Sequence, residues 1–168
     1  PFATILTSKV RGKSWRIGSG ARIDTTEAQV AELEDGTLML NCRDNRGGSR
    51  SILTTKDLGQ SWQAHPTDRA ALPEPVCMAS LLRLDTSGGK PVFVFSNPAR
   101  TNERSAMTIK VSNDNAMTWP APLHTLYDSR KGAGYSCLAA GRTHVGVLYE
   151  GQSELYFLRI PIAELLAP

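Results

Sequence analysis

The chain has 168 residues, of which 40% are hydrophobic and 21% are charged, a composition typical of a globular domain. Its 19 lysines and arginines against 16 aspartates and glutamates give a net charge of +3, which is too small to indicate a nucleic-acid partner. Because no apolar run reaches about 18 residues, the sequence predicts no membrane-spanning helix.

The predicted secondary structure is a series of short strands, because no long segment keeps a helical period. Glu34-Asp35-Gly36 is a hairpin signal between the first two strands, and a second turn is predicted from Asp85 to Gly89. Only residues 162–166 could form a turn of helix. The predicted strands fall into three groups: 27–33, 37–43 and 50–55; 76–84, 91–97 and 105–112; 135–140, 144–150 and 154–162.

One octet occurs three times, at Ser8–Trp15, Thr55–Trp62 and Ser112–Trp119, each time where a third strand would turn into a fourth. The spacing is close to the roughly 40–50 residues that a four-stranded propeller blade needs. Its aspartate would accept backbone N–H groups, its glycine would allow a positive φ, and its tryptophan would pack between neighbouring sheets. The octet therefore predicts a folding device and carries no chemistry.

The octets resemble the Asp-box of sialidases and of other Asp-box propellers. The match is good at Thr55–Trp62, whereas Ala116 replaces glycine in the third octet and Val10 replaces aspartate in the first. This resemblance implies an all-β chain that forms about three blades of a six-bladed β-propeller, each an antiparallel four-stranded sheet. Approximate blade pieces are 1–20, 21–68, 69–127 and 128–168.

Five polar residues between the octets follow the order of a sialidase site: Glu27, Arg43, Arg104, Tyr135 and Glu150. Order and box context together resemble the C-terminal half of the catalytic propeller of a bacterial-type exo-sialidase, over essentially the whole chain. The resemblance implies that Tyr135 is the nucleophile and Glu27 its base. It also implies that Arg43 and Arg104 bind the substrate carboxylate and that Glu150 orients a further arginine.

The chemistry of these residue types fits that implication. Guanidinium groups bind a carboxylate bidentately, and a sialic acid carries a carboxylate on its anomeric carbon. A neutral phenol approaches such a carbon with less charge repulsion than a second carboxylate, and sialidases are known exceptions to the two-carboxylate rule of glycosidases. A phenol with a pKa near 10 needs an adjacent base, which Glu27 would supply.

Other functions remain open. Each of the five residues, taken alone, is more often a surface charge, a turn residue or ordinary packing. A non-catalytic Asp-box module that binds glycan or protein would need no tyrosine–glutamate pair. A different glycoside hydrolase would depend on a carboxylate pair, and Asp44 or Glu103 would then matter more than Tyr135.

The remaining polar and sulfur-containing residues predict no metal site and no cofactor. The three histidines are isolated in sequence. Arg46 and Arg50 flank Gly47-Gly48 and are expected to decorate a hairpin. The three cysteines are widely spaced in apolar runs and are expected to be buried thiols: Cys42, Cys77 and Cys137.

The resemblance implies sialylated glycans as substrates and a secreted, periplasmic or cell-surface location, although no signal is present in this chain. The first arginine of the triad and an acid/base aspartate would lie upstream of Pro1. Since an open arc of blades leaves strand edges unpaired, the chain is expected to pair with a missing N-terminal half or to self-associate.

Overall fold

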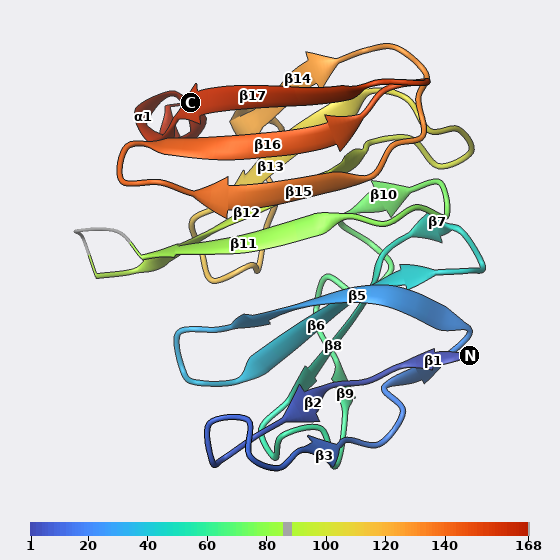
Figure 1. Cartoon of the computed structure of the whole chain (residues 1–168), viewed down its shortest axis with the longest axis vertical. Coiled ribbons are helices and arrows are strands. Elements are labelled where there is room, and N and C mark those ends of the chain that lie inside the picture. Colours follow the sequence, from blue (N-terminus) through green and yellow to red (C-terminus); the bar gives the residue numbers. More distant parts are fainter. Residues whose placement is uncertain (86–88, 168) are drawn as a thin grey trace.

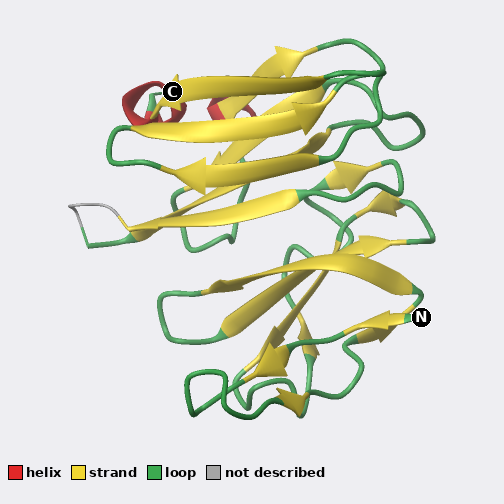
Figure 2. Cartoon of the chain, in the orientation of Figure 1, coloured by secondary structure: helices red, strands yellow, loops and turns green. Residues whose placement is uncertain are grey.

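The computed structural model describes residues 1–85 and 89–167, so the predicted turn from Asp85 to Gly89 falls largely outside the described residues. The described part is all-β, as predicted, with antiparallel sheets and very little helix (Figure 2). It contains no helix long and apolar enough to cross a bilayer.

The strands of the chain build successive sheets. The N-terminal part forms two short pairs, β1 (Phe2–Ala3) with β4 (Arg22–Ile23) and β2 (Leu6–Thr7) with β3 (Arg16–Ile17). The first four-stranded sheet has the order β5 (Thr25–Glu32), β6 (Leu38–Asp44), β8 (Ser51–Thr55), β9 (Gln63–Ala64). The second has the order β11 (Ser80–Asp85), β12 (Pro91–Pro98), β13 (Met107–Ser112), β14 (His124–Asp128). A three-stranded sheet follows, with the order β15 (Ser136–Ala140), β16 (His144–Glu150), β17 (Leu155–Pro161).

Short elements complete the chain. β7 (Gly48–Ser49) pairs with β10 (Pro73–Glu74) between the two four-stranded sheets. A 3-10 turn, η1 (Ala121–Leu123), precedes β14. The predicted helical turn is α1 (Ile162–Leu166), which follows the last strand.

The sheets stack face to face, with their first strands next to one another (Figure 1). β11 contacts β5 on one side and β15 on the other. In β12, Phe93 and Phe95 enter the core shared with the first sheet, whereas Val92 and Val94 enter the core shared with the third. This alternation makes both faces of the second sheet packing surfaces, so that sheet depends on both neighbours for burial.

The octets are turns at one end of the sheets. In the second octet, Asp57 accepts hydrogen bonds from the backbone N–H groups of Gln60 and Ser61, both at 2.9 Å, and Gly59 has a φ of 81°. In the third, Asp114 accepts the Thr118 N–H at 2.9 Å. The predicted turn chemistry is therefore confirmed at both aspartates.

The tryptophans and one cysteine correct the sequence-based expectation. Trp119 packs edge-on against Phe95 between the first two sheets, as expected. Trp15 is 62% exposed, because no sheet among the described residues lies beyond the first octet. Cys137 is exposed rather than buried, because it points to the uncovered face of the three-stranded sheet.

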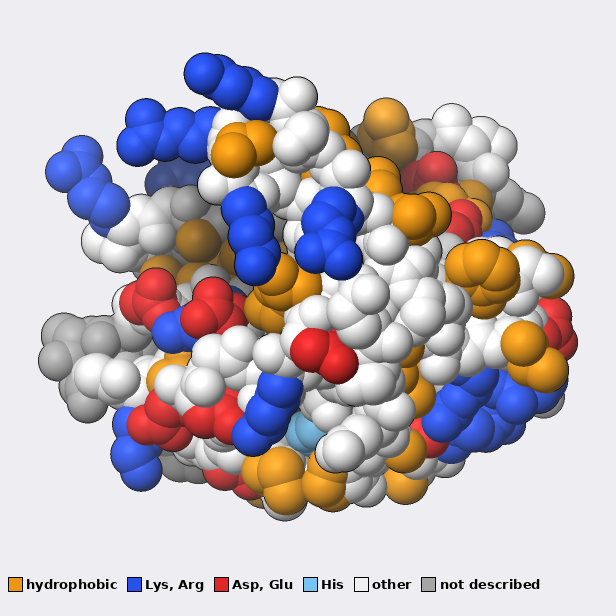
Figure 3. Space-filling view, turned by 90° about the horizontal axis from the view of Figure 1, so that it is seen from below, with side chains coloured by type: hydrophobic (Ala, Val, Ile, Leu, Met, Phe, Trp, Pro, Cys, Tyr) orange, Lys and Arg blue, Asp and Glu red, His pale blue; other side chains and the backbone are white. Residues whose placement is uncertain are grey.

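Both uncovered faces at the ends of the stack are apolar. On the three-stranded sheet, Cys137, Leu148 and Phe157 are cross-strand neighbours, and Phe157 is 63% exposed. On the N-terminal side, hydrophobic side chains reach the surface between lysines and arginines (Figure 3). Exposed on β2 and β3 are Leu6 and Ile17.

A glycine substitution tests the packing of the second octet. A Cβ at Gly59 would lie 2.9 Å from Ile5 Cγ1, whereas a Cβ at Gly36 meets only Glu32 Oε1, at 3.9 Å, and both glycines have a φ of 81°. Gly36→Ala should therefore lower the free energy of unfolding by about 1 kcal/mol, through backbone strain alone. Gly59→Ala should cost roughly 1–3 kcal/mol more, through overpacking. Urea denaturation of both variants measures the difference, and equal midpoints would contradict the packing described here.

Candidate active site

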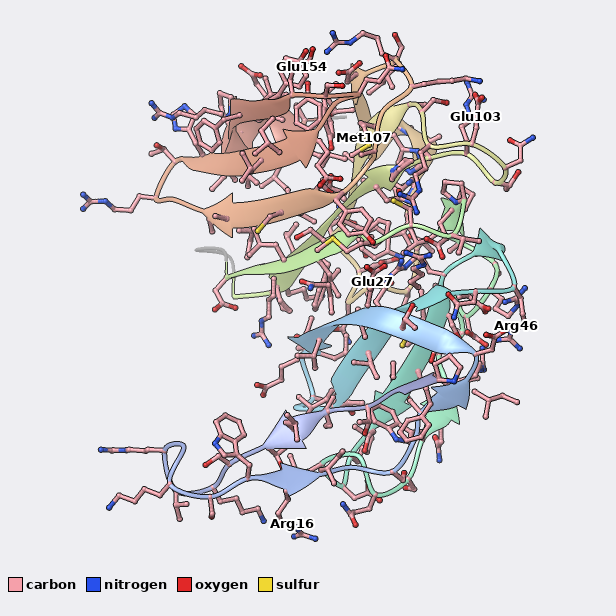
Figure 4. All side chains as sticks on the ribbon, turned by 45° about the vertical axis from the view of Figure 1, so that its right-hand side comes forward. Arg16, Glu27, Arg46, Glu103, Met107 and Glu154 are labelled. Carbon is pink, nitrogen blue, oxygen red and sulfur yellow. The ribbon has the colours of Figure 1, made fainter. Side chains whose placement is uncertain are left out.

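The site begins at a bulge in β5. The pairing of β5 with β6 shifts register between Thr26 and Ala28, and Glu27, the extra residue, has a positive φ of 30°. A bulge re-aims one side chain out of the strand alternation. Here it directs the Glu27 carboxylate away from its own sheet, to the border with the sheets stacked above it (Figure 4).

Glu27 meets Tyr135 at that border. The Tyr135 hydroxyl donates a short hydrogen bond to Glu27 Oε1, across 108 positions of sequence. Arg43, at the end of β6, donates from Nη1 to Glu27 Oε2 at 2.6 Å and to the Tyr135 oxygen at 3.3 Å. One carboxylate, one phenol and one guanidinium therefore form a closed triangle.

Arg104 faces the same tyrosine from the loop before β13. Its Cζ lies 5.6 Å from the centre of the Tyr135 ring. Its terminal nitrogens donate to Ala133 O at 2.9 Å and to Val76 O at 3.0 Å. Two backbone carbonyls thus fix the guanidinium beside the phenol without neutralising its charge.

The backbone before β15 places Tyr135. Gly134 has a φ of 88°, and a Cβ there would lie 2.9 Å from Pro98 Cγ, so both conformation and space require glycine. Glu150, at the end of β16, accepts the Tyr135 backbone N–H at 3.2 Å. The Tyr135 carbonyl in turn accepts the Glu150 N–H at 2.9 Å. Glu150 therefore supports the segment that carries the phenol.

The contacts shift the acidities of the pair in opposite directions. Partial burial raises the pKa of Glu27, but hydrogen bonds from Tyr135 and Arg43, with the charge of Arg104, outweigh it and leave that pKa below its usual value. The hydrogen bond to Glu27, followed by burial, raises the pKa of Tyr135. Near neutral pH the site therefore holds a carboxylate, ready to accept a proton, and a protonated phenol.

All five residues predicted from the sequence lie at the same end of the sheets. β5 begins and β6 ends there, whereas the octet turns follow the opposite ends of β8 and β13. The side chains of four of them contact one another: Glu27, Arg43, Arg104 and Tyr135. The fifth, Glu150, bonds the backbone N–H of Tyr135.

The rival carboxylates are engaged elsewhere. Asp44 is fully buried and forms ion pairs with Arg46 and Arg69. Glu103 binds Lys131 at 2.7 Å and Ser105 at 2.8 Å. Among the described residues, no group of three or more His, Cys, Asp and Glu side chains is arranged to hold a metal ion.

Arg50 was wrongly expected to decorate a hairpin. Its side chain is fully buried and paired with Glu74, which sequence analysis did not single out. Two signals of burial were available in the sequence. Arg50 begins the apolar strand 50–55, and Glu74 lies in the apolar stretch 72–77. Neither shows from sequence that the two meet.

The sequence of the chain is similar to that of known sialidases. Residues 2–148 match the protein family described as BNR repeat-like domain. The chain is 46% identical to a sialidase of Bacteroides fragilis and 32% identical to a sialidase of Micromonospora viridifaciens. These alignments cover 99% and 97% of this chain.

Solved structures agree. The chain superposes on the Hadza microbial sialidase Hz136 with a TM-score of 0.91 and 46% identity, over 98% of this chain and 33% of that one. The intramolecular trans-sialidase of Ruminococcus gnavus matches with a TM-score of 0.78, over 97% of this chain and 38% of that one. At 22% identity that second match supports the fold alone.

The chain spans less than a third of the length of the two sialidases matched by sequence. It covers 31% of the Bacteroides fragilis protein and 26% of the Micromonospora viridifaciens protein. The likeness therefore concerns only part of each of those two sialidases.

A titration tests the electrostatics of the pair. In Glu27→Gln the phenol loses its carboxylate acceptor and keeps two arginines, so the pKa of Tyr135 should fall. NMR titration of tyrosine labelled with ¹³C at Cζ, assigned with Tyr135→Phe, measures this. Glu150→Gln is the control, because Glu150 contacts the backbone of Tyr135 and should leave the phenol pKa nearly unchanged. A Tyr135 pKa that is the same with and without Glu27 would contradict the hydrogen bond.

Proposed function

This chain belongs to the family of BNR repeat-like domains, and we propose that it forms the C-terminal part of the catalytic propeller of an exo-α-sialidase. The enzyme would hydrolyse terminal sialic acids from glycoconjugates. The observation that carries the proposal is the contact of Tyr135 with both Glu27 and Arg43.

The two arginines supply the recognition of the substrate. A sialic acid would place its carboxylate against the guanidinium groups of Arg43 and Arg104, which flank the phenol on different sides. Guanidinium forks hold a carboxylate in a fixed orientation. The anomeric carbon, to which that carboxylate is attached, would then lie next to the Tyr135 oxygen.

The first chemical step uses the Tyr135–Glu27 hydrogen bond. The Tyr135 oxygen attacks the anomeric carbon and passes its proton to Glu27, while the bond to the leaving oxygen breaks. A low pKa keeps Glu27 unprotonated before the step, and transfer only at the moment of attack avoids a free phenolate. The leaving oxygen takes its proton from a general acid that the family resemblance places outside this chain.

In the second step water attacks the anomeric carbon and passes its proton to the same group that protonated the leaving oxygen, while the tyrosine oxygen is displaced and recovers its proton from Glu27. Arg43 bonds to both members of the pair and so stabilises the charge as it moves between them. Together the two steps give retention of configuration, as for other enzymes with a covalent glycosyl intermediate.

The alternative is a non-catalytic Asp-box module that binds glycan or protein. Such a module needs arginines for recognition but no base beside a phenol. The strained Glu27 backbone, which aims a carboxylate at Tyr135, favours the enzyme, because strain at a non-glycine residue persists where function uses it.

Sialylated glycans would be the substrates, and the enzyme would meet them as a secreted, periplasmic or cell-surface protein. The uncovered apolar faces at both ends of the stack would pack against further blades of the propeller.

A tyrosine substitution tests the nucleophile. In the full-length protein, Tyr135→Phe should lower kcat for a fluorogenic sialoside by roughly 10³–10⁶-fold, because loss of a nucleophile can cost up to about 10⁶ in kcat. Tyr156→Phe is the matched control, because Tyr156 stacks on Tyr149 and bonds Arg130 instead. Turnover by Tyr135→Phe at the wild-type rate would exclude Tyr135 as nucleophile.

The 168 residues on their own test the need for further blades. They should show no sialoside turnover and should associate in solution through the uncovered face that carries Leu148 and Phe157. Light scattering measures the mass, and the double variant Leu148→Thr/Phe157→Thr should reduce association. A monomeric wild-type chain with full turnover would contradict both expectations.

A further inference from the structure

Beneath the site lies an ion pair that the proposed chemistry does not use. Arg50 Nη1 lies 3.1 Å from Glu74 Oε2, and both side chains are fully buried. Removing two charges from water is costly, and buried ion pairs are often no more stabilising than apolar residues of the same volume. Stability alone therefore does not explain why charged residues occupy these two positions.

The guanidinium of Arg50 uses all five of its N–H donors. Besides Glu74 it donates to Asn41, through Nε to Oδ1 at 2.7 Å and through Nη2 to the carbonyl at 3.2 Å. It also donates to Cys77 O at 2.7 Å and to Glu27 O at 3.4 Å. One side chain thus holds backbone from β5, from β6 and from the loop before β11.

Glu74 completes the set from the other side. Its Oε1 accepts the Asp44 N–H at 3.1 Å, the peptide that directly follows Arg43. Its Oε2 accepts the Cys77 N–H at 3.0 Å. The pair therefore fixes the peptides of Glu27 and Cys77 and the peptide after Arg43.

The loop that contains Cys77 also contacts Arg104 and the segment before Tyr135. Val76 O accepts a hydrogen bond from Arg104, and the Cys77 thiol lies 3.5 Å from Gly134 O, directly before Tyr135. Burial raises the pKa of Cys77 to about 11, so it contacts Gly134 as a neutral thiol.

Two strained residues adjoin the pair. Glu27 has a φ of 30° and Val76 a φ of 54°, a conformation that a β-branched residue adopts only under constraint. Strain of this kind persists where the surroundings over-determine the backbone. Arg50 bonds the carbonyls of Glu27 and Cys77, and Glu74 accepts the N–H of the Val76–Cys77 peptide, so the pair together constrains the backbone at both places.

We propose that Arg50 and Glu74 are positioning residues that hold Glu27 and Tyr135 in hydrogen-bonding register. This inference rests on the proposed sialidase function for its kinetic consequence, but its structural consequence does not. Without the pair, the bulge at Glu27 and the loop at Cys77 would relax separately, and the carboxylate would lose its phenol partner.

The effect has a definite sign. The charged groups that face Glu27 and Tyr135 are Arg43 and Arg104, and neither arginine is replaced in the variants. Loss of the Tyr135–Glu27 bond would raise the pKa of Glu27 toward its ordinary value and lower the pKa of Tyr135. The acid limb of the kcat/KM profile, which reports the base of the free enzyme, would move to higher pH.

The experiment uses Arg50→Lys, which keeps the charge but cannot reach every acceptor, in the full-length protein. The Tyr135 pKa should fall in the ¹³C titration, kcat/KM should drop by about 100-fold, and the acid limb should move upward. Arg50→Met/Glu74→Leu is the second variant, because apolar replacement of a buried pair commonly preserves folding. It should show the same changes in a protein that still unfolds in one cooperative transition, at a lower melting temperature because the peptide groups bound to the pair lose their partners.

Arg22→Met/Asp68→Leu is the matched control. This pair is largely buried, with 21% and 14% of the two side chains exposed, and Arg22 also bonds Ser51. It should leave the Tyr135 pKa and the acid limb in place. If the Arg50 variants also leave both in place, the positioning role is wrong, whatever their activity. If the wild-type full-length protein hydrolyses no sialoside while the Arg50 variants still lower the Tyr135 pKa, the proposed function is wrong and the positioning role stands.

Discussion

Each of the three larger sheets of the described chain carries apolar side chains on both faces, and neighbouring sheets bury most of the faces between them. β12 shows the constraint most clearly, because successive residues enter two different cores. Stacking is therefore the condition for burial, and the inner strands β5, β11 and β15 become neighbours as a result (Figure 1). The antiparallel order then brings the start of each inner strand to one common end.

The candidate active site forms at the end of the sheets where the inner strands begin. Glu27 and Tyr135 are 108 positions apart, yet Glu27 lies near the start of the inner strand β5 and Tyr135 directly precedes the inner strand β15, and they meet in one hydrogen bond. Rigid sheets alone would place them only approximately. The buried pair of Arg50 and Glu74 fixes the irregular backbone between the sheets, where the strand pattern no longer determines conformation.

Local features could be predicted from the sequence, and long-range ones could not. β16 was predicted to the residue, because its alternation and the flanking turns are local. β11 was predicted to begin at Val76 but begins at Ser80, because residues 76–79 are apolar yet form the loop that Arg50 and Arg104 hold. The Arg50–Glu74 pair was missed because it joins positions 24 apart that no periodicity relates. The site residues and the adjacency of Glu27 to Tyr135 came from a family resemblance, whereas the bonds of Arg43 to both groups came only with the structure.

Capture of the covalent intermediate tests the central claim, that Tyr135 attacks the anomeric carbon, most directly. A sialic acid with fluorine at C3 and a fluoride leaving group at C2 should react with the full-length enzyme and release the sugar slowly, because fluorine beside the anomeric carbon destabilises the cationic transition state. Peptide mass spectrometry of the trapped enzyme should find the sugar on the peptide that contains Tyr135, and on no peptide of Tyr135→Phe. A sugar attached to the Glu27 peptide, or an inactivated enzyme without any adduct at Tyr135, would contradict the account.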